Sequence, residues 1–217
     1  MNQIASIAMI AWTLSRGGAP RTEGASVRPV SPMAQLSQST DALRTSLRRA
    51  YPSWSPEAEA QRSVVRRLVG GSMDYGEISR RALGDRWEGL SHDDRTEFVT
   101  SLGRLIEGRY RVRQAYLGAD YRIHFDREIV SGHGTASVFA TLFGDPRGKS
   151  VRVALEYRLL WRGDRWTVYD LVTDGQSLLD NYRGEFDRII TRSSFSALLQ
   201  RMKDRAAREE REFASQE

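Results

Sequence analysis

The sequence predicts an α+β fold, a four-stranded antiparallel sheet with helices before and after it that pack on one of its faces. Apolar residues recur at helical spacing from Leu36 to Tyr110, and they alternate with polar residues from Tyr121 to Thr173. Helical spacing returns after Gly175. Short turns between the alternating runs are typical of an antiparallel meander, and the order of helices, sheet and helices is typical of the α+β class.

Four helices are expected before the sheet, and their ends carry residues that suit helix termini. Ser55, Asp74 and Ser91 stand where a side-chain oxygen can cap the first turn. Gly70 and Gly84 stand where a helix ends, because glycine readily adopts the backbone conformations that stop one. The expected helices cover residues 36–51, 55–70, 74–84 and 91–110.

Four strands and two further helices follow in the chain. The strands are expected at residues 121–126, 135–143, 151–161 and 166–173, joined by glycine-containing turns. After the sheet, a helical stripe covers residues 178–190, and a last helix starts at Ser193 or Ser194. We therefore expect a leader and flexible linker at residues 1–32, one domain at residues 33–204, and a charged helical tail at residues 205–217.

Length and composition exclude several classes of protein. The 217 residues, 40% hydrophobic and 28% charged, suit one globular domain with a sizeable core. The absence of cysteine excludes disulfides, cysteine-ligated metals and thiol nucleophiles. The formal net charge is +5, and all of the 33 basic residues except Lys149 and Lys203 are arginines. The arginines are scattered among acidic residues, so a nucleic-acid-binding face is not expected.

The N-terminal segment is typical of an exported protein. Ile4–Leu14 is an apolar run that suits a secretory signal and is too short to span a bilayer. The segment that follows contains Pro20, Pro29 and Pro32 among glycines and serines, which is typical of a linker. No Lys or Arg precedes the run, so a misassigned start is the alternative interpretation.

The sequence lacks the motifs of catalysis. It has no phosphate loop, no nucleophile elbow and no zinc or calcium motif. His92, His124 and His133 are far apart, and the glycines around His133 predict a tight turn. We therefore predict a protein that is not an enzyme and has no metal or cofactor. Asp170, on a strand among apolar neighbours, is the one carboxylate that could serve as a buried base in an enzyme.

Two blocks of the sequence carry a recognisable pattern. The first runs from Leu83-Gly84-Asp85-Arg86-Trp87 through Asp94-Arg95-Thr96-Glu97-Phe98 to Tyr110. The second combines Tyr157-Arg158-Leu159, Trp166-Thr167-Val168-Tyr169-Asp170, Asp174-Gly175-Gln176-Ser177-Leu178-Leu179 and Asn181-Tyr182-Arg183-Gly184-Glu185-Phe186. In order and spacing these blocks resemble the MlaC family, the periplasmic phospholipid-binding components of the Mla ABC transport system, also called toluene tolerance proteins. The resemblance spans about Leu36 to Asp204, with departures at Gln176, where the family usually has valine, and at Ser194, where it often has glycine.

The resemblance implies a curved, NTF2-like sheet and helices that close over an apolar pocket for acyl chains. It implies a soluble periplasmic carrier of phospholipid, expected to be a monomer, that helps to maintain the lipid asymmetry of the outer membrane. Its partners would be an inner-membrane MCE-domain ring with its ABC transporter, an outer-membrane lipoprotein complex and, transiently, the membrane surface. Carriage of another lipid, such as a hopanoid, and an adaptor protein with a filled core remain the alternatives.

We expect the acyl chains to lie between the helix at residues 94–110, the strand at residues 151–161 and the helix at residues 178–190. The candidate lining residues are the large apolar and aromatic side chains whose spacing directs them to this space, although each could also be ordinary core. They are Trp87, Phe98, Leu102, Ile106, Tyr110, Val138, Val153, Leu155, Tyr157, Trp166 and Val168.

Overall fold

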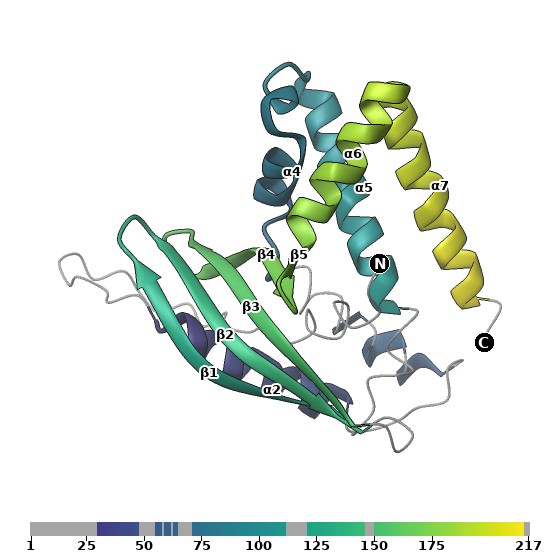
Figure 1. Cartoon of the computed structure of the whole chain (residues 1–217). Helices are drawn as coiled ribbons and strands as arrows, with labels where there is room; N and C mark the ends of the chain where they lie inside the picture. The colour runs from purple at the N-terminus through teal and green to yellow at the C-terminus, as the bar shows by residue number, and fades with distance from the viewer. Residues whose placement is uncertain are drawn as a thin grey trace.

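The computed structural model describes residues 30–47, 55–57, 59–61, 63–64, 71–111, 121–145 and 150–214 (Figure 1). The expected leader lies outside these residues up to residue 29, as does much of the expected second helix, although residues 56–57, 59–61 and 63–64 are helical. In the described part of the chain, no helix is both long and apolar enough to cross a bilayer.

The elements occur in the predicted order, which confirms the α+β class. The helices are α2 (Pro32–Leu47), α4 (Tyr75–Leu83), the 3-10 helix η1 (Gly84–Trp87), α5 (His92–Arg111), α6 (Leu178–Arg192) and α7 (Phe195–Ala214). The strands are β1 (Tyr121–Ser131), β2 (Thr135–Gly144), β3 (Val151–Trp161), β4 (Trp166–Thr173) and β5 (Gln176–Ser177), which lie side by side in chain order and are all antiparallel. Helix α7 continues without a break past residue 205.

The prediction of four strands is wrong by one, because the described sheet has a short fifth strand. Asp174 and Gly175 both have positive φ angles, 47° and 79°, which is the geometry of a tight hairpin turn. This turn folds Gln176 and Ser177 back to pair with the last two residues of β4. Two residues are too few to show an alternating pattern, so the sequence pattern could not reveal β5.

Three of the predicted helix caps, Asp74, Ser91 and Ser194, are confirmed: a side-chain oxygen of each accepts the backbone N–H three residues further on, at 2.9–3.1 Å. Ser177, which was not predicted as a cap, makes the same contact with Asp180 at the start of α6. Gly84 ends α4 with a φ angle of 56°, a conformation that glycine adopts without steric cost. These contacts are local in the chain, so residue order alone could predict them.

One face of the sheet, which we call the inner face, is apolar and buried. Its residues in the two central strands are Ala136, Val138, Ala140, Leu142, Val153, Leu155, Tyr157 and Leu159. In β1 a bulge between Phe125 and Arg127 shifts the alternation by one residue. As a result Phe125 and Glu128 both face the inner side, opposite Ala140 and Val138.

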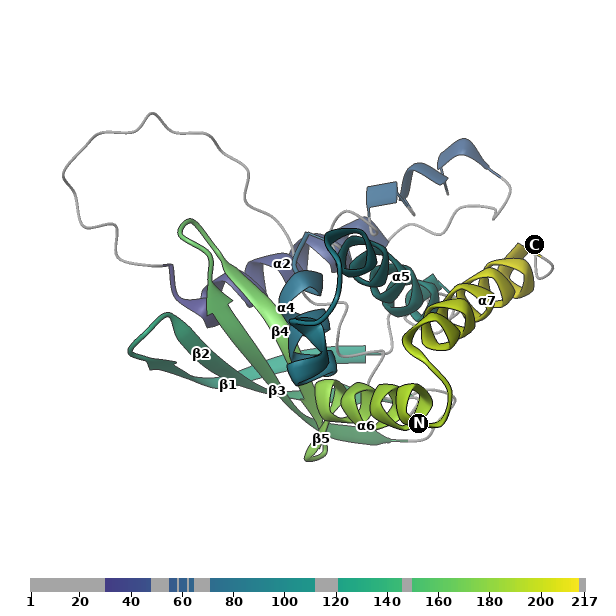
Figure 2. The ribbon, with the colours of Figure 1, turned by 90° about the horizontal axis from the view of Figure 1, so that it is seen from above.

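The helices are arranged in two groups on the inner side of the sheet. Helix α2 runs along β1 and β2, whereas α4, α5, α6 and α7 gather beside β4 and β5 (Figures 1 and 2). This arrangement confirms that helices from both ends of the chain pack on one side of the sheet.

Helix α2 is fastened to the sheet by contacts with residues far along the chain. Glu128 Oε2 accepts hydrogen bonds from Ser31 Oγ at 2.7 Å and from the backbone N–H of Met33 at 2.8 Å. A carboxylate at this position also complements the dipole of the helix N-terminus. The side-chain amide of Gln35 accepts a hydrogen bond from the backbone N–H of Trp166 and donates one to the carbonyl of the same residue. These bonds fix how α2 lies over the strands.

Candidate functional site

Four of the predicted lining residues form one apolar surface on the inner face. Val138 lies directly opposite Tyr157 in the β2–β3 register, and Val153 and Leu155 continue the same face along β3. Each of the four side chains is at most 2% exposed. Burial raises the pKa of the Tyr157 phenol well above its ordinary value. The phenol therefore stays neutral, and this surface carries no charge.

The two predicted residues of β4 extend this surface toward α2 and α4. Trp166 lies opposite Trp161, and its indole N–H donates a hydrogen bond to the Val30 carbonyl at 2.7 Å. Val168 bonds through its backbone to Ser72 and Asp74, both at 2.9 Å, so that a short parallel bridge covers part of the β4 edge. Both side chains are buried, and Trp166 also holds the start of α2.

The predicted residues before the sheet lie in the group of helices. Phe98, Leu102 and Ile106 are fully buried on α5, and the Phe98 ring lies between those of Phe186 and Phe195, with centroids 5.5 and 5.9 Å away. These ring contacts place Phe98 in the packing of α5 against α6 and α7.

The remaining two predicted residues, Trp87 and Tyr110, lie outside these two groups of buried contacts. Trp87 in η1 is half-buried, with the Arg95 guanidinium 5.4 Å from the centre of its ring. Tyr110 belongs to α5, but its side chain lies outside the described residues.

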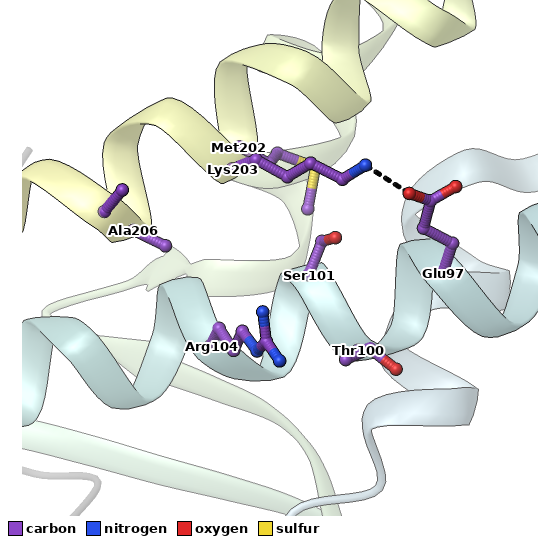
Figure 3. Close-up of a pocket in the computed structure, with 8 residues that line it drawn as sticks. Glu97, Thr100, Ser101, Arg104, Met202, Lys203 and Ala206 are labelled. Carbon is purple, nitrogen blue, oxygen red and sulfur yellow. Dashed lines mark ion pairs between the residues drawn. The ribbon is translucent and has the colours of Figure 1, made fainter.

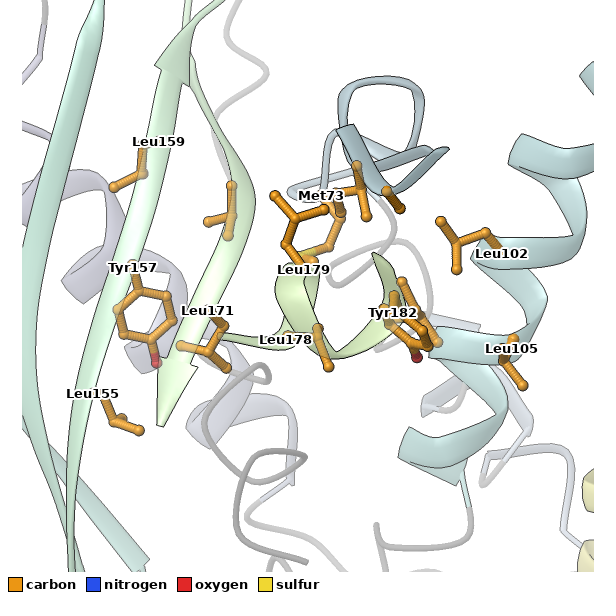
Figure 4. Packing of buried hydrophobic residues seen from close by; sticks show 14 of the residues in the cluster. Met73, Leu102, Leu105, Leu155, Tyr157, Leu159, Leu171, Leu178, Leu179 and Tyr182 are labelled. Atoms are coloured by element: carbon orange, nitrogen blue, oxygen red, sulfur yellow. The ribbon is translucent and has the colours of Figure 1, made fainter. Parts of the chain in front are cut away.

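Residues that the prediction omitted lie between the sheet and α5. Figure 4 shows Leu171, Leu178, Leu179 and Tyr182 in the space from β3 to α5, and all four are buried members of the same apolar cluster as the predicted residues. Three of them belong to the helical stripe that the sequence showed on α6. The pattern identified them as apolar, but it could not show that the start of α6 reaches between the sheet and the other helices.

Asp170, the candidate buried base, uses both of its carboxylate oxygens in structural contacts. Its Oδ1 accepts the backbone N–H of Leu179 at 3.0 Å, and its Oδ2 accepts Ser177 Oγ at 2.8 Å and Arg158 Nη1 at 3.1 Å. The carboxylate therefore joins β3, β4, β5 and the start of α6. Among the described residues, no three of His, Cys, Asp or Glu are grouped so that they could hold a metal ion.

Arg183, next to Tyr182 in the second sequence block, also has a structural role. Its guanidinium donates two hydrogen bonds, at 3.1 and 2.9 Å, to the carbonyl of Arg81 near the end of α4. Together with the Asp170 contacts, this bond explains why the block combines an aspartate, a serine and an arginine: they connect β4 to α6 and α6 to α4.

A groove of about 400 Å³ between α5 and α7 is distinct from the predicted site. It is shown in Figure 3 and lined by Glu97, Thr100, Ser101, Arg104, Met202, Lys203, Ala206 and Ala207. Glu97 and Lys203 form an ion pair across it. None of the eleven predicted residues lines this groove, and its three charged side chains do not suit the acyl chains of a lipid.

Comparisons with known proteins agree with the fold and with the sequence pattern. The family model described as MlaC protein matches residues 37–204. The intermembrane phospholipid transport system binding protein MlaC of Haemophilus influenzae is 19% identical over 182 residues, which cover 83% of this chain and 85% of that protein. A phospholipid-binding protein from Ralstonia solanacearum, solved in complex with a phospholipid, has the same fold with a TM-score of 0.66 and 17% identity over 83% of this chain and 99% of that one. Because the family model covers most of its length, the chain belongs to the MlaC family.

Proposed function

We propose that this protein is a periplasmic lipid carrier that binds the acyl chains of a phospholipid and moves lipid between the inner and outer membranes. The observation that carries the proposal is the buried apolar surface formed by the inner face of β2 and β3 and the helices beside it, in a chain of the MlaC family. The phospholipid bound by the Ralstonia solanacearum protein of the same fold supports the choice of ligand.

The physical need for such a carrier follows from the hydrophobic effect. A diacyl lipid has about thirty methylene groups, and exposing each one to water costs about 0.8 kcal/mol. Unassisted passage through water therefore costs on the order of 20 kcal/mol. A carrier needs dry apolar walls and a mouth for the head group, and it needs no nucleophile, metal or tuned base.

Within this proposal, the wall of the pocket is the inner face of β2 and β3. Val138, Val153, Leu155 and Tyr157 are the sheet residues that we assign to it, and Ile106 is the α5 residue, near the end of that helix. The engagement of Phe98 with two other rings and of Trp166 with α2 gives these two residues a structural role in addition to any contact with lipid.

We further propose that the carrier receives and delivers lipid at two membrane complexes. Membership of the MlaC family supports an inner-membrane MCE-domain ring with its ABC transporter at one end and an outer-membrane lipoprotein complex at the other. The name of the Haemophilus influenzae relative, an intermembrane transport system binding protein, supports the same assignment. On this basis the protein contributes to the lipid asymmetry of the outer membrane.

The direct test is to identify what the protein carries. The protein is purified from an exporting host without detergent and analysed by native mass spectrometry and lipid extraction. We expect a bound mass of one diacyl phospholipid per chain. A bound hopanoid would change the cargo, whereas a protein that is free of lipid and takes up none from liposomes would contradict the carrier.

A pair of substitutions tests the position of the pocket. Leu155→Trp adds bulk on the inner face, and Leu198→Trp adds the same bulk at a residue of α7 that is equally buried. If Leu155 faces the pocket, its variant stays close to wild-type stability but loses bound lipid. The control variant is destabilised by about 1–3 kcal/mol, because a packed core resists extra volume, and it keeps its lipid.

The same pair distinguishes the carrier from a protein with a filled core. The position of Leu178, Leu179 and Tyr182 between the sheet and α5 is the observation that favours a filled core. In that case Leu155→Trp is destabilised as much as Leu198→Trp, and neither protein contains lipid. A folded Leu155→Trp variant with the lipid content of the wild type contradicts the assignment of this face as the pocket.

A further inference from the structure

The face of the sheet opposite the inner face, which we call the outer face, carries arginines held against aromatic rings. In the β1–β2–β3 register, Arg122, Phe143 and Arg152 form one row across the three strands, and Arg127 lies opposite Phe139 in a second row. The Arg127 guanidinium is 3.8 Å from the centre of the Phe139 ring, and that of Arg152 is 5.6 Å from the Phe143 ring. Stacking of this kind restrains the guanidinium and leaves its N–H groups free to bind anions.

Arginines outnumber acidic residues on this face, where Arg122, Arg127, Arg152 and Arg158 lie with Asp126 and Glu156. Arg122, Arg127 and Arg152 are exposed, and none of the three has a carboxylate partner in the described part of the chain. Arg158, by contrast, is neutralised by contacts with Glu156 at 3.2 Å and with Asp170 at 3.1 Å. The bulge in β1 turns Arg127 outward, because without the extra residue it would face the inner side.

Apolar side chains are exposed on the same face. Phe143 is 41% exposed and Ile129 is 48% exposed, toward opposite ends of the face. Among the described residues, no helix covers this side of the sheet (Figures 1 and 2). The outer face is therefore a broad open surface that combines unpaired cations with exposed apolar groups.

We infer that the outer face is a docking surface for an anionic lipid bilayer. Guanidinium groups bind phosphate oxygens through paired hydrogen bonds, and exposed phenyl and branched side chains suit the boundary between head groups and acyl chains. A bilayer presents phosphates across the whole face, whereas an acidic protein would have to place its carboxylates at spacings that match these arginines. The inference rests on the proposed function, since a carrier of phospholipid works beside membranes, and it assigns the contact to these residues.

Vesicle sedimentation with the purified full chain tests the inference. The probes are vesicles of phosphatidylglycerol and phosphatidylcholine, compared with vesicles of phosphatidylcholine alone, at low and high salt. Each arginine near an anionic surface contributes about fivefold to binding, so R122Q/R127Q/R152Q is expected to bind the anionic vesicles about 100-fold more weakly than the wild type. Binding by the wild type is expected to weaken at high salt, because exposed charges are screened.

A matched variant separates this face from the overall charge of the protein. Arg188, Arg192 and Arg201 are exposed on α6 and α7, and R188Q/R192Q/R201Q removes the same number of charges. This control is expected to keep anionic-vesicle binding within severalfold of the wild type. An equal loss in both variants, or no binding of the wild type to anionic vesicles, would overturn the inference.

Two further readouts separate the inference from the proposed function and from another occupant. Bound lipid, measured by native mass spectrometry, is expected to be the same in the outer-face variant and the wild type. If the wild type carries lipid but does not bind anionic vesicles, the docking surface is refuted and the proposed carrier function is not. A third result would assign the face to an acidic protein and overturn the inference. In that case the wild type binds polyglutamate but not anionic vesicles, and R122Q/R127Q/R152Q loses the binding to polyglutamate.

Discussion

Asp170 should be the most sensitive carboxylate of the described fold, and Asp170→Asn tests this directly. Its side chain is completely buried and accepts hydrogen bonds from Arg158, Ser177 and the backbone of Leu179. An asparagine has the same shape, but its amide NH₂ group replaces one of the two accepting oxygens, and every neighbouring group at this site is itself a hydrogen-bond donor. One of these contacts is therefore lost, and the charge that balances the Arg158 guanidinium disappears.

The expected magnitude follows from these contacts. Breaking a buried and hydrogen-bonded ion pair by changing one partner costs about 3–5 kcal/mol, and Arg158 is partly exposed, so the lower end of this range applies. A loss of about 3 kcal/mol in the free energy of unfolding corresponds to a fall of about 6–12 °C in Tm for a chain of this size.

Urea unfolding followed by circular dichroism measures the effect, with Asp187→Asn as the control. Asp187 is 62% exposed and pairs with Arg86 at 2.7 Å on the surface, so its variant should lose less than about 1 kcal/mol. If Asp170→Asn is as stable as Asp187→Asn, Asp170 does not join the strands to α6 as described. Lipid content in the folded Asp170 variant should equal that of the wild type, because a binding role would lower it.

Four other substitutions, one of them a control, have defined outcomes. The pKa of Glu77 is lowered to about 2, chiefly by a hydrogen bond from Arg80. The ionised carboxylate therefore stabilises the fold, and this stabilisation is lost as the pH falls from about 4.5 toward 2. Glu77→Gln should make the fall of Tm over that pH range less steep. Glu128→Ala removes the acceptor at the start of α2 and should cost about 1–2 kcal/mol in urea unfolding. An added carbon has open space at both Gly84 and Gly132, but only Gly84 has a positive φ angle. Gly84→Ala should therefore cost about 1–2 kcal/mol, whereas Gly132→Ala should be close to neutral.

Each of these expectations has a contradicting result. A steep acid transition that persists in Glu77→Gln would assign the loss of stability to other carboxylates. Wild-type unfolding of Glu128→Ala would mean that the start of α2 does not depend on this acceptor. Equal effects of alanine at Gly84 and Gly132 would mean that the backbone conformation of Gly84 is not what limits the residue there.

Most of the secondary structure was predictable because its causes are local. Asp74, Ser91 and Ser194 cap helices through bonds to residues three positions away, and the alternation of β2 and β3 directly reflects one buried face. The fifth strand was missed because two residues cannot show a period. Strand β4 is buried over nearly all its length, so its burial does not alternate, and a bulge at Tyr169 interrupts its pairing with β3.

The candidate site was predictable as a set of apolar residues but not as an arrangement. Spacing correctly identified Val138, Leu155 and Tyr157 as members of one face. It could not show that Phe98 packs with rings of α6 and α7, or that Leu178 reaches between the sheet and α5. An apolar side chain has the same pattern in the sequence whether it contacts a ligand, another helix or the sheet.

The sequence by itself determined the class of fold, the order of the elements, the helix caps and membership of the MlaC family, because these depend on neighbouring residues and on their spacing. The tertiary structure alone decided which helices cover which strands, that Asp170 binds Arg158 and Ser177, and that Glu128 caps α2. It also decided that Arg122, Arg127 and Arg152 share one open face. These contacts join residues far apart in the chain, or on different strands, so they exist only once the strands have paired in register and the bulges have fixed which side chains face inward.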